Sequence, residues 1–266
     1  MIITSASNQR LKKLRQVLRV GQGDENAPVP VEGLKLLREA IKSRLQIEEL
    51  FVSSHCRSEA EALLNQVAGN LPEIIEVADK VFPSISSTET PQGILALAKL
   101  PAVDLDRLLR TTAFLLVGEE LQDPGNLGTL VRSAEAFGVR GLLLTYGSVD
   151  PRNPKVIRSS AGSVFRVPCL TGLSGTLLLE QLSRYRFEIV AATPQGEIDF
   201  RDISYQGRLA LAVGNEGRGL SEAVLRQATL KIRIPTGPLV ESLNVSVATS
   251  IIMCEAARQR ASEPKT

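Results

Sequence analysis

Six short apolar runs in the second half of the chain limit its possible folds more than any other feature of the sequence. Several of them are continuous rather than alternating, which is typical of parallel strands buried on both faces of a sheet. Stretches with the apolar spacing of a helix, at 127–137, 154–160 and 174–183, fit between the runs. We therefore expect an α/β domain built on a parallel sheet, with strands at 113–117, 141–145, 165–168, 187–192, 209–213 and 230–234.

The first part of the chain has its own alternation of helix and strand patterns. Ser5 is placed to cap a helix that runs through Val20, and a loop follows at 21–30. The remaining patterns predict helices and strands, in chain order, at 34–43, 49–53, 58–68, 74–77 and 93–97. This order favours a small α/β or α+β domain.

These patterns divide the chain into two domains. Residues 1–99 form the smaller one, and 111–266 form the larger one with the parallel sheet. The stretch 100–110, which holds Pro101 and mixed charges, is expected to be a linker.

Composition narrows the class of protein. Apolar residues make up 43% and charged residues 23% of the chain, as in a soluble globular protein with a sizeable core. No apolar run reaches the ~18 to 20 residues of a membrane span, and the start of the chain lacks the apolar region of a signal peptide. We expect a cytoplasmic protein that does not enter a membrane.

The cysteine and histidine content argues against metal chemistry. Cys56, Cys169 and Cys254 are widely separated, no CxxC motif occurs, and His55 is the single histidine. Buried thiols are expected rather than a disulfide framework, and no metal site is expected. A mechanism with a histidine general base would depend on His55 alone.

Net charge is +2 and does not by itself indicate a nucleic-acid partner. Local clusters are more informative, because acid-free basic runs are either solvated faces or contacts to phosphate. Both readings stay open for the two clusters, which consist of Arg10, Lys12, Lys13 and Arg15, and of Arg152, Lys155 and Arg158.

Three polar, glycine-containing stretches follow predicted strands, at 118–128, 214–220 and 234–248. In open α/β sheets, ligands bind beyond the carboxyl ends of the strands, which is where these stretches fall. Glycine lets the backbone turn or approach a ligand closely. Turn formation and helix capping, the latter by Ser242 for example, are the alternatives for each stretch taken alone.

A conventional nucleotide-binding site is excluded. The stretch 214–219 is not GxGxxG, and no GxxxxGK[ST] motif occurs. Lys231 and Arg233 stand near the position where a dinucleotide-binding fold would carry an acidic residue. A dehydrogenase or P-loop ATPase does not fit this pattern.

The three stretches together resemble a known family. Their motifs occur in order, at 126–132 with 136–138, at 214–217 with 219–220, and at 234–235 with 241–248. Over about 112–260 the chain resembles the SpoU (TrmH-like) branch of the SPOUT RNA methyltransferases. The signs at 5–14, 31–33 and 87–93 also resemble that family's substrate-binding domain, whose fold is like that of kink-turn-binding ribosomal proteins.

The resemblance implies a deep trefoil knot in the C-terminal domain and a homodimer formed through that domain. It also implies S-adenosyl-L-methionine as the cofactor, held bent against loops that contact it mainly through backbone groups. The positions that match the family's cofactor-binding stretches are Ala192, Thr193, Gly214, Asn215, Gly217, Ile234 and Leu243.

The same resemblance implies methyl transfer to a ribose 2′-hydroxyl. Arg132 matches the arginine thought to activate that hydroxyl. Because a guanidinium stays protonated in proteins, we expect Arg132 to stabilise the developing alkoxide and to grip a phosphate. Asn126 and Asn244 are expected to orient the ribose, Glu216 to fix Arg132 or an amide, and Ser242 to hold a 3′ group.

A structured RNA is the expected substrate, with ribosomal RNA favoured and transfer RNA as the alternative. An alternative of another class is a non-catalytic RNA-binding or assembly factor that has kept the fold. Residues 21–28 depart from the family pattern, because they lack its basic and aromatic residues. This departure puts in doubt a tight grip on RNA by that loop.

Overall fold

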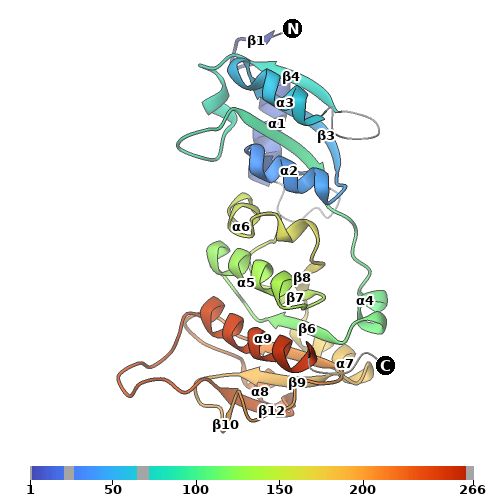
Figure 1. Cartoon of the computed structure of the whole chain (residues 1–266), viewed down its shortest axis with the longest axis vertical. Helices are drawn as coiled ribbons and strands as arrows, with labels where there is room; N and C mark the ends of the chain where they lie inside the picture. Colours follow the sequence, from blue (N-terminus) through green and yellow to red (C-terminus); the bar gives the residue numbers. More distant parts are fainter. Residues whose placement is uncertain (1, 21–26, 65–71, 262–266) are drawn as a thin grey trace. The chain divides into compact units, whose positions relative to one another are not determined.

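The computed structural model describes residues 2–20, 27–64 and 72–261 (Figure 1). It divides into two compact units. Unit 1 comprises the described residues of Met1–Ala102 together with Arg152–Phe165, and unit 2 comprises Val103–Pro151 and the described residues from Arg166 onward. The segment Arg152–Phe165 thus groups with unit 1, whereas the sequence alone suggested that it belongs to the larger domain.

Unit 1 contains a five-stranded mixed sheet in the order β1-β4-β3-β5-β2. The first three strands in that order are parallel to one another, and β5 is antiparallel to both of its neighbours. The strands are β1 (Ile2–Ile3), β2 (Val29–Glu32), β3 (Gln46–Ser53), β4 (Glu73–Val77) and β5 (Ile94–Lys99). The helices are α1 (Gln9–Val20), α2 (Leu34–Lys42), α3 (Arg57–Leu64) and α6 (Pro154–Ser159), with short 3₁₀ turns at Ser54–Cys56, Phe82–Ile85 and Ser163–Phe165.

Two local expectations for unit 1 were wrong. The side chain at the start of α1 is Asn8, whose Oδ1 accepts the Arg10 N–H at 2.9 Å, while Ser5 Oγ accepts the Ser7 N–H in the preceding turn. The loop expected at 21–30 was to end at Pro30, but Val29 and Pro30 already belong to β2. Proline is tolerated there because β2 is the edge strand of the sheet.

Glu32, at the end of β2, is a buried carboxylate that organises the following loop of unit 1. It accepts hydrogen bonds from the hydroxyl of Ser86, from Ser87 N–H (3.0 Å) and Oγ (2.7 Å), and from Thr88 Oγ1 (2.7 Å). Arg158 of α6 donates to Ser87 Oγ at 2.6 Å. Burial alone would raise the pKa of Glu32, but the hydrogen bonds outweigh it and lower the pKa.

Replacement of Glu32 by glutamine tests this cluster. We expect Glu32→Gln to destabilise the Ser86–Thr88 loop and β2 by about 1–3 kcal/mol at pH 7. The glutamine side chain would place an NH₂ group, itself a donor, against hydroxyl and N–H groups that now donate to the carboxylate. A lowered pKa means that the stabilisation is complete above the ordinary glutamate pKa of about 4.3 and is lost as pH falls through the lower folded-state pKa. Amide hydrogen exchange of β2 and β5, at pH 7 and at acidic pH, measures the difference.

The matched control is Glu89→Gln, because Glu89 is an exposed glutamate in the same loop. It should leave exchange in β2 and β5 unchanged. Equal protection of β2 in the Glu32→Gln variant and the parent chain at pH 7 would contradict this account of the cluster.

Unit 2 is built on a seven-stranded sheet in which every pair of neighbours is parallel, in the order β10-β12-β9-β11-β6-β7-β8. The expected α/β fold with a parallel sheet is confirmed. The strands are β6 (Phe114–Gly118), β7 (Leu142–Thr145), β8 (Cys169–Leu173), β9 (Glu188–Ala192), β10 (Ile198–Asp199), β11 (Leu209–Val213) and β12 (Leu230–Arg233). The helices are α4 (Leu105–Thr111), α5 (Pro124–Ala136), α7 (Gly175–Arg184), α8 (Glu222–Gln227) and α9 (Val245–Ala261).

The core of unit 2 explains why its strands are apolar throughout. One cluster joins alternate residues of β6, β9 and β11 with α4, α7 and α8. The intervening strand residues, such as Leu116 and Leu211, are also buried. Helices α5 and α9 pack against each other, and Ser250 Oγ donates to Ser133 Oγ at 2.7 Å between them.

Two expectations for unit 2 were wrong. The stretch expected to be a linker contains α4, whose Leu108 and Leu109 are buried in the core cluster. The strand expected at 165–168 begins only at Cys169, after Pro168, which has no N–H to give to a ladder. The trefoil knot stays a prediction.

Candidate active site

The polar stretches of unit 2 leave the sheet at one edge. The register pairs Gly118 with Val213, Ala191 with Ala212, and Ala192 with Ile232. Because these strands are parallel and end at nearly the same level, the loops after β6, β9, β11 and β12 all begin at the carboxyl edge of the sheet. This is the edge at which α/β sheets bind ligands.

Three predicted site residues from three of these loops form one hydrogen-bonded line. Asn126 Nδ2, at the start of α5, donates to Glu216 Oε1 at 3.0 Å. Asn244 Nδ2, after β12, donates to Asn126 Oδ1 at 3.0 Å. We call this the Glu216–Asn126–Asn244 line. It joins stretches that lie far apart in the sequence.

Helix caps place the two asparagines. Helix α5 begins with Pro124 after Asp123, whose Oδ1 accepts the Asn126 N–H at 2.8 Å. Asn244 caps α9, since its Oδ1 accepts the N–H groups of Ser246 (2.9 Å) and Val247 (3.3 Å). The capping role considered for Ser242 therefore belongs to Asn244.

Glu216 anchors the line as an ionised carboxylate. Besides Asn126, it accepts the N–H groups of Gln122 (3.4 Å) and Asp123 (3.3 Å). Partial burial would raise the pKa of Glu216, but the hydrogen bonds from Asn126 and from backbone N–H groups outweigh it and lower the pKa. Of the two expected partners of Glu216, Arg132 or an amide, the structure shows the side-chain amide of Asn126.

Arg132 lies on α5, on the helix that Asn126 begins. Its side chain is exposed, and it makes no hydrogen bond or ion pair with any residue that the structure describes. A guanidinium carries five N–H donors and no acceptor. Arg132 can therefore offer its donors to an anionic ligand at no cost in internal contacts.

Ser242 is not part of the line. It lies in an exposed stretch between β12 and α9, where Val240 N–H donates to the Gly237 carbonyl at 2.9 Å and Thr236 Oγ1 to the Val240 carbonyl at 3.1 Å. Among the residues of 2–20, 27–64 and 72–261, Ser242 has no hydrogen-bond partner. Its assigned role stays a prediction.

Several predicted cofactor residues lie in tight backbone turns. A Cβ atom on Gly214 would lie 2.2 Å from the Gly219 carbonyl carbon and 2.3 Å from the Leu220 nitrogen. Asn215 and Gly219 pair across this turn, with N···O distances of 3.1 and 2.9 Å. Gly217 N–H donates to Asn215 Oδ1 at 2.9 Å. We call the segment from Gly214 to Gly219 the GNEG turn.

A second close approach joins the ends of β9 and β12. Thr193 N–H donates to the Ile232 carbonyl at 3.0 Å. A Cβ on Gly196 would lie 2.3 Å from the Ile232 carbonyl carbon. This contact places Ala192 and Thr193 beside the strand that leads into Ile234, and Ile234 and Leu243 are both half-buried.

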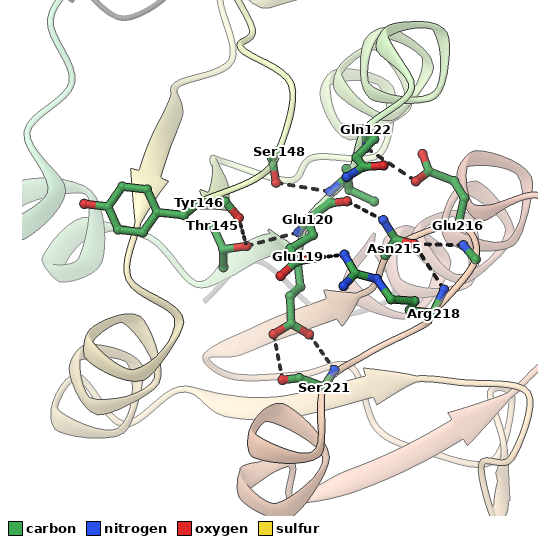
Figure 2. Close-up of polar contacts among 12 residues, drawn as sticks. Glu119, Glu120, Gln122, Thr145, Tyr146, Ser148, Asn215, Glu216, Arg218 and Ser221 are labelled. Carbon is green, nitrogen blue, oxygen red and sulfur yellow. Dashed lines mark hydrogen bonds and ion pairs between the residues drawn. The ribbon is translucent and has the colours of Figure 1, made fainter.

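Sequence reasoning missed further residues that brace these loops (Figure 2). The carboxylate of Glu119 accepts both the N–H and the hydroxyl of Ser221 at 2.7 Å, at the start of α8. Thr145, the last residue of β7, accepts the N–H of Glu120 (3.0 Å), and Ser148, in the loop that follows, accepts the N–H of Leu121 (3.1 Å). The only available signal was that Glu119 and Glu120 fall inside the first polar stretch.

Both basic clusters belong to unit 1. On α1, both Nη atoms of Arg10 pair with Glu73 (2.8 and 2.9 Å), and Arg15 donates to the carbonyls of Leu11 and Ala6. The remaining cluster residues on that helix, Lys12 and Lys13, are exposed. In the other cluster Lys155 is exposed, and Arg152 and Arg158 are half-buried.

The described residues form neither a metal site nor a membrane span. No group of three or more His, Cys, Asp or Glu residues there could hold a metal ion. No described helix has both the length and the apolar character needed to span a bilayer.

Comparisons with known proteins agree with this geometry. The model of the SpoU rRNA Methylase family matches residues 113–254, and that of the MRM3-like substrate binding domain matches residues 8–96. An uncharacterized tRNA/rRNA methyltransferase of Synechocystis, slr1673, is 34% identical over 97% of this chain and 94% of its own. The 23S rRNA (guanosine(2553)-2′-O)-methyltransferase RlmP of Bacillus subtilis is 30% identical over 94% of this chain and 97% of its own.

Solved structures lead to the same family. The AdoMet-bound rRNA methyltransferase from Sinorhizobium meliloti has a TM-score of 0.84 and 28% identity, and the match covers 97% of each chain. The family model spans more than half of this chain, including the whole Glu216–Asn126–Asn244 line. The chain belongs to the SpoU rRNA methylase family.

Proposed function

We propose that this chain transfers a methyl group from S-adenosylmethionine to a ribose 2′-hydroxyl of ribosomal RNA. The observation that carries the proposal is the Glu216–Asn126–Asn244 line, which joins polar groups from three loops at the start of α5, the helix that carries Arg132. The relatives support the reaction, since RlmP is named for 2′-O-methylation of 23S rRNA. They also favour ribosomal RNA over transfer RNA.

The residues at the sheet edge suit S-adenosylmethionine. Gly214 and Gly196 leave no room for a Cβ against neighbouring backbone, so these loops can turn back closely on the sheet edge beside which we place the cofactor. The cofactor supplies a methyl group that its sulfonium makes reactive. Gly214, Ile234 and Leu243 would contact the adenosine part, and Ala192, Thr193, Asn215 and Gly217 would complete the binding residues.

The chain's own residues would align the ribose and stabilise charge. In-line transfer needs the oxygen, methyl and sulfur to be aligned, and alignment can supply up to ~7–11 kcal/mol of barrier reduction. Asn126 and Asn244 would orient the ribose, with Glu216 holding Asn126 in place. Arg132 would stabilise the developing alkoxide and bind the neighbouring phosphate, as a donor and not as a base. Ser242 would hold the 3′ side.

Unit 1 would bind the RNA outside the reacting nucleotide. It carries the match to a substrate-binding domain and both basic clusters. The exposed lysines of these clusters are Lys12, Lys13 and Lys155. Their ammonium groups would bind phosphates of the RNA backbone. We propose a cytoplasmic enzyme, in keeping with a ribosomal substrate.

A homodimer through unit 2 is part of the proposal. Val247 and Ile251, one turn apart on α9, are 49% and 38% exposed, and Cys254 continues this face. The buried face of α9 is formed instead by Ser246, Thr249, Ile252, Met253 and Ala256. An apolar stripe left exposed on a helix is typical of a protein interface.

Replacement of Ile251 by arginine tests the dimer. We expect Ile251→Arg to weaken self-association by about 2–4 kcal/mol, because a charge would enter the centre of an apolar contact. Sedimentation equilibrium measures it. The matched control is Leu177→Arg, because Leu177 is 60% exposed on α7 and should leave the dimer intact. A folded Ile251→Arg protein that sediments as a dimer would disprove this interface.

Calorimetry and methyl transfer together test the function. We expect S-adenosylmethionine to bind the chain, and tritium from the labelled methyl group to enter an unmodified 23S ribosomal RNA transcript but not a transfer RNA transcript. Labelling of the transfer RNA alone would support the alternative substrate. A chain that binds RNA without binding the cofactor would be the non-catalytic assembly factor.

A further inference from the structure

Both the oxygen and the nitrogen of the Asn215 side-chain amide are hydrogen-bonded within the protein (Figure 2). Its Oδ1 accepts the N–H groups of Gly217 (2.9 Å) and Arg218 (3.1 Å), inside the GNEG turn. Its Nδ2 donates to the carbonyl of Glu120, in the loop after β6, at 2.9 Å. One end of the amide therefore closes the turn on itself, and the other end ties the turn to a different loop.

Glu120 is held in an unusual conformation to make this contact. Its φ is 51°, in the left-handed region that non-glycine residues rarely adopt. Its N–H donates to Thr145 Oγ1 at 3.0 Å, and its carboxylate pairs with Arg218. Strained backbone of this kind is kept where the surroundings impose it, and it concentrates at functional sites.

The contact lies between the two parts of the site that must be aligned. Only 121–123 separate Glu120 from α5, which carries Asn126 and Arg132. That short stretch is itself fixed, because Leu121 N–H donates to Ser148 Oγ (3.1 Å) and the Leu121 carbonyl accepts Val149 N–H (2.7 Å). Glu216 of the same turn also holds Gln122, Asp123 and Asn126, and Arg218 pairs with Glu120. The bond from Asn215 to the Glu120 carbonyl therefore acts together with these contacts in setting the spacing between the GNEG turn and α5.

We propose that Asn215 is a positioning residue for methyl transfer. Through its bond to the Glu120 carbonyl, Asn215 aligns the cofactor-binding GNEG turn with α5, the helix that carries Arg132. The inference rests on the proposed function. In this proposal the Asn215 side chain does not contact the cofactor. The backbone of the GNEG turn makes that contact.

Asn215→Asp separates the two ends of the amide. Aspartate keeps an oxygen for the N–H groups of Gly217 and Arg218, so the GNEG turn is retained. It replaces the donor to the Glu120 carbonyl by a second acceptor, so the bond between the loops becomes a repulsion. We expect kcat to fall by about tenfold or more, since small misplacements of reacting groups are costly. The Kd for S-adenosylmethionine should stay within about twofold of the parent value, as the turn itself persists.

Two further variants complete the experiment. Asn215→Ala removes both ends and should lower kcat and cofactor affinity together. Arg226→Ala removes an exposed ion pair with Glu222 on α8 and should change neither quantity. The measurements are single-turnover transfer to a 23S ribosomal RNA transcript and calorimetry with S-adenosylmethionine.

The outcomes distinguish this inference from the proposed function. Parent-like kcat in Asn215→Asp would overturn the positioning role, and so would a loss of cofactor affinity as large as that of Asn215→Ala. In both cases the parent chain would still methylate RNA. A parent chain that transfers no methyl group would overturn the proposed function, and the role of Asn215 with it.

Discussion

Replacing Arg132 by alanine should lower kcat for RNA methylation by about 10²–10³-fold, the loss typical of one donor to a developing oxyanion. The side chain is exposed and has no partner among the residues that the structure describes, so its removal breaks no internal contact. The affinity for S-adenosylmethionine and the thermal stability should both stay unchanged. Single-turnover transfer, calorimetry and thermal unfolding measure the three quantities.

Lysine at position 132 tests how the charge acts. A guanidinium binds an alkoxide and a phosphate with paired N–H groups, whereas an ammonium is a point charge. We therefore expect Arg132→Lys to lose most of the rate as well. Arg140→Ala is the matched control, because Arg140 is an exposed arginine just beyond the same helix, and it should retain parent activity. Near-normal turnover of Arg132→Lys would rule out the paired role.

Replacing Gly214 by alanine should abolish cofactor binding, with an affinity loss of about 100-fold or more. The new methyl group would lie 2.2 Å from the Gly219 carbonyl carbon and 2.3 Å from the Leu220 nitrogen, both backbone atoms. The clash can be removed only if the GNEG turn opens, and opening breaks the backbone pairing of Asn215 with Gly219. Overpacking of this kind typically costs about 1–3 kcal/mol of stability. Calorimetry with S-adenosylmethionine and thermal unfolding measure both effects.

Gly175→Ala is the control for the Gly214 prediction. Among the described residues outside its own helix, a Cβ there would meet Thr145 Cγ2, at an ordinary contact distance of 4.0 Å. This variant should fold and bind the cofactor as the parent does. Parent-like affinity in a folded Gly214→Ala protein would show that the turn does not form the cofactor site.

The strands of unit 2 could be predicted from sequence because burial on both faces leaves a continuous apolar run. The exception is the run at 165–168, where Pro168 delays the strand until Cys169. Helix α4 was missed because it is short and carries charged residues between its leucines, of which Leu108 and Leu109 are buried and Leu105 only partly so. The third polar stretch leads into apolar residues with helical spacing, Val247, Ile251 and Cys254, but in α9 Val247 and Ile251 are exposed rather than buried.

The polar contacts of the site could be predicted only as a set of motifs. Asn126 lies 90 residues from Glu216 and 118 from Asn244, and the spacing of motifs along a chain does not give the register that brings them together. The bond from Asn215 to Glu120 spans 95 residues and depends on a positive φ that no residue pattern indicated. Likewise, the sequence left open whether the basic residues of α1 form a solvated face or contact phosphate, and it did not indicate that Arg10 pairs with Glu73.

The most direct test asks which atom of the RNA receives the methyl group. RNA labelled by the chain from tritiated S-adenosylmethionine is hydrolysed in alkali, which cleaves every linkage that has a free 2′-hydroxyl. If the loops present the methyl group to a ribose oxygen beside Arg132, the label will be recovered in alkali-resistant dinucleotides. Label recovered in mononucleotides would place the methyl group on a base and would contradict the account.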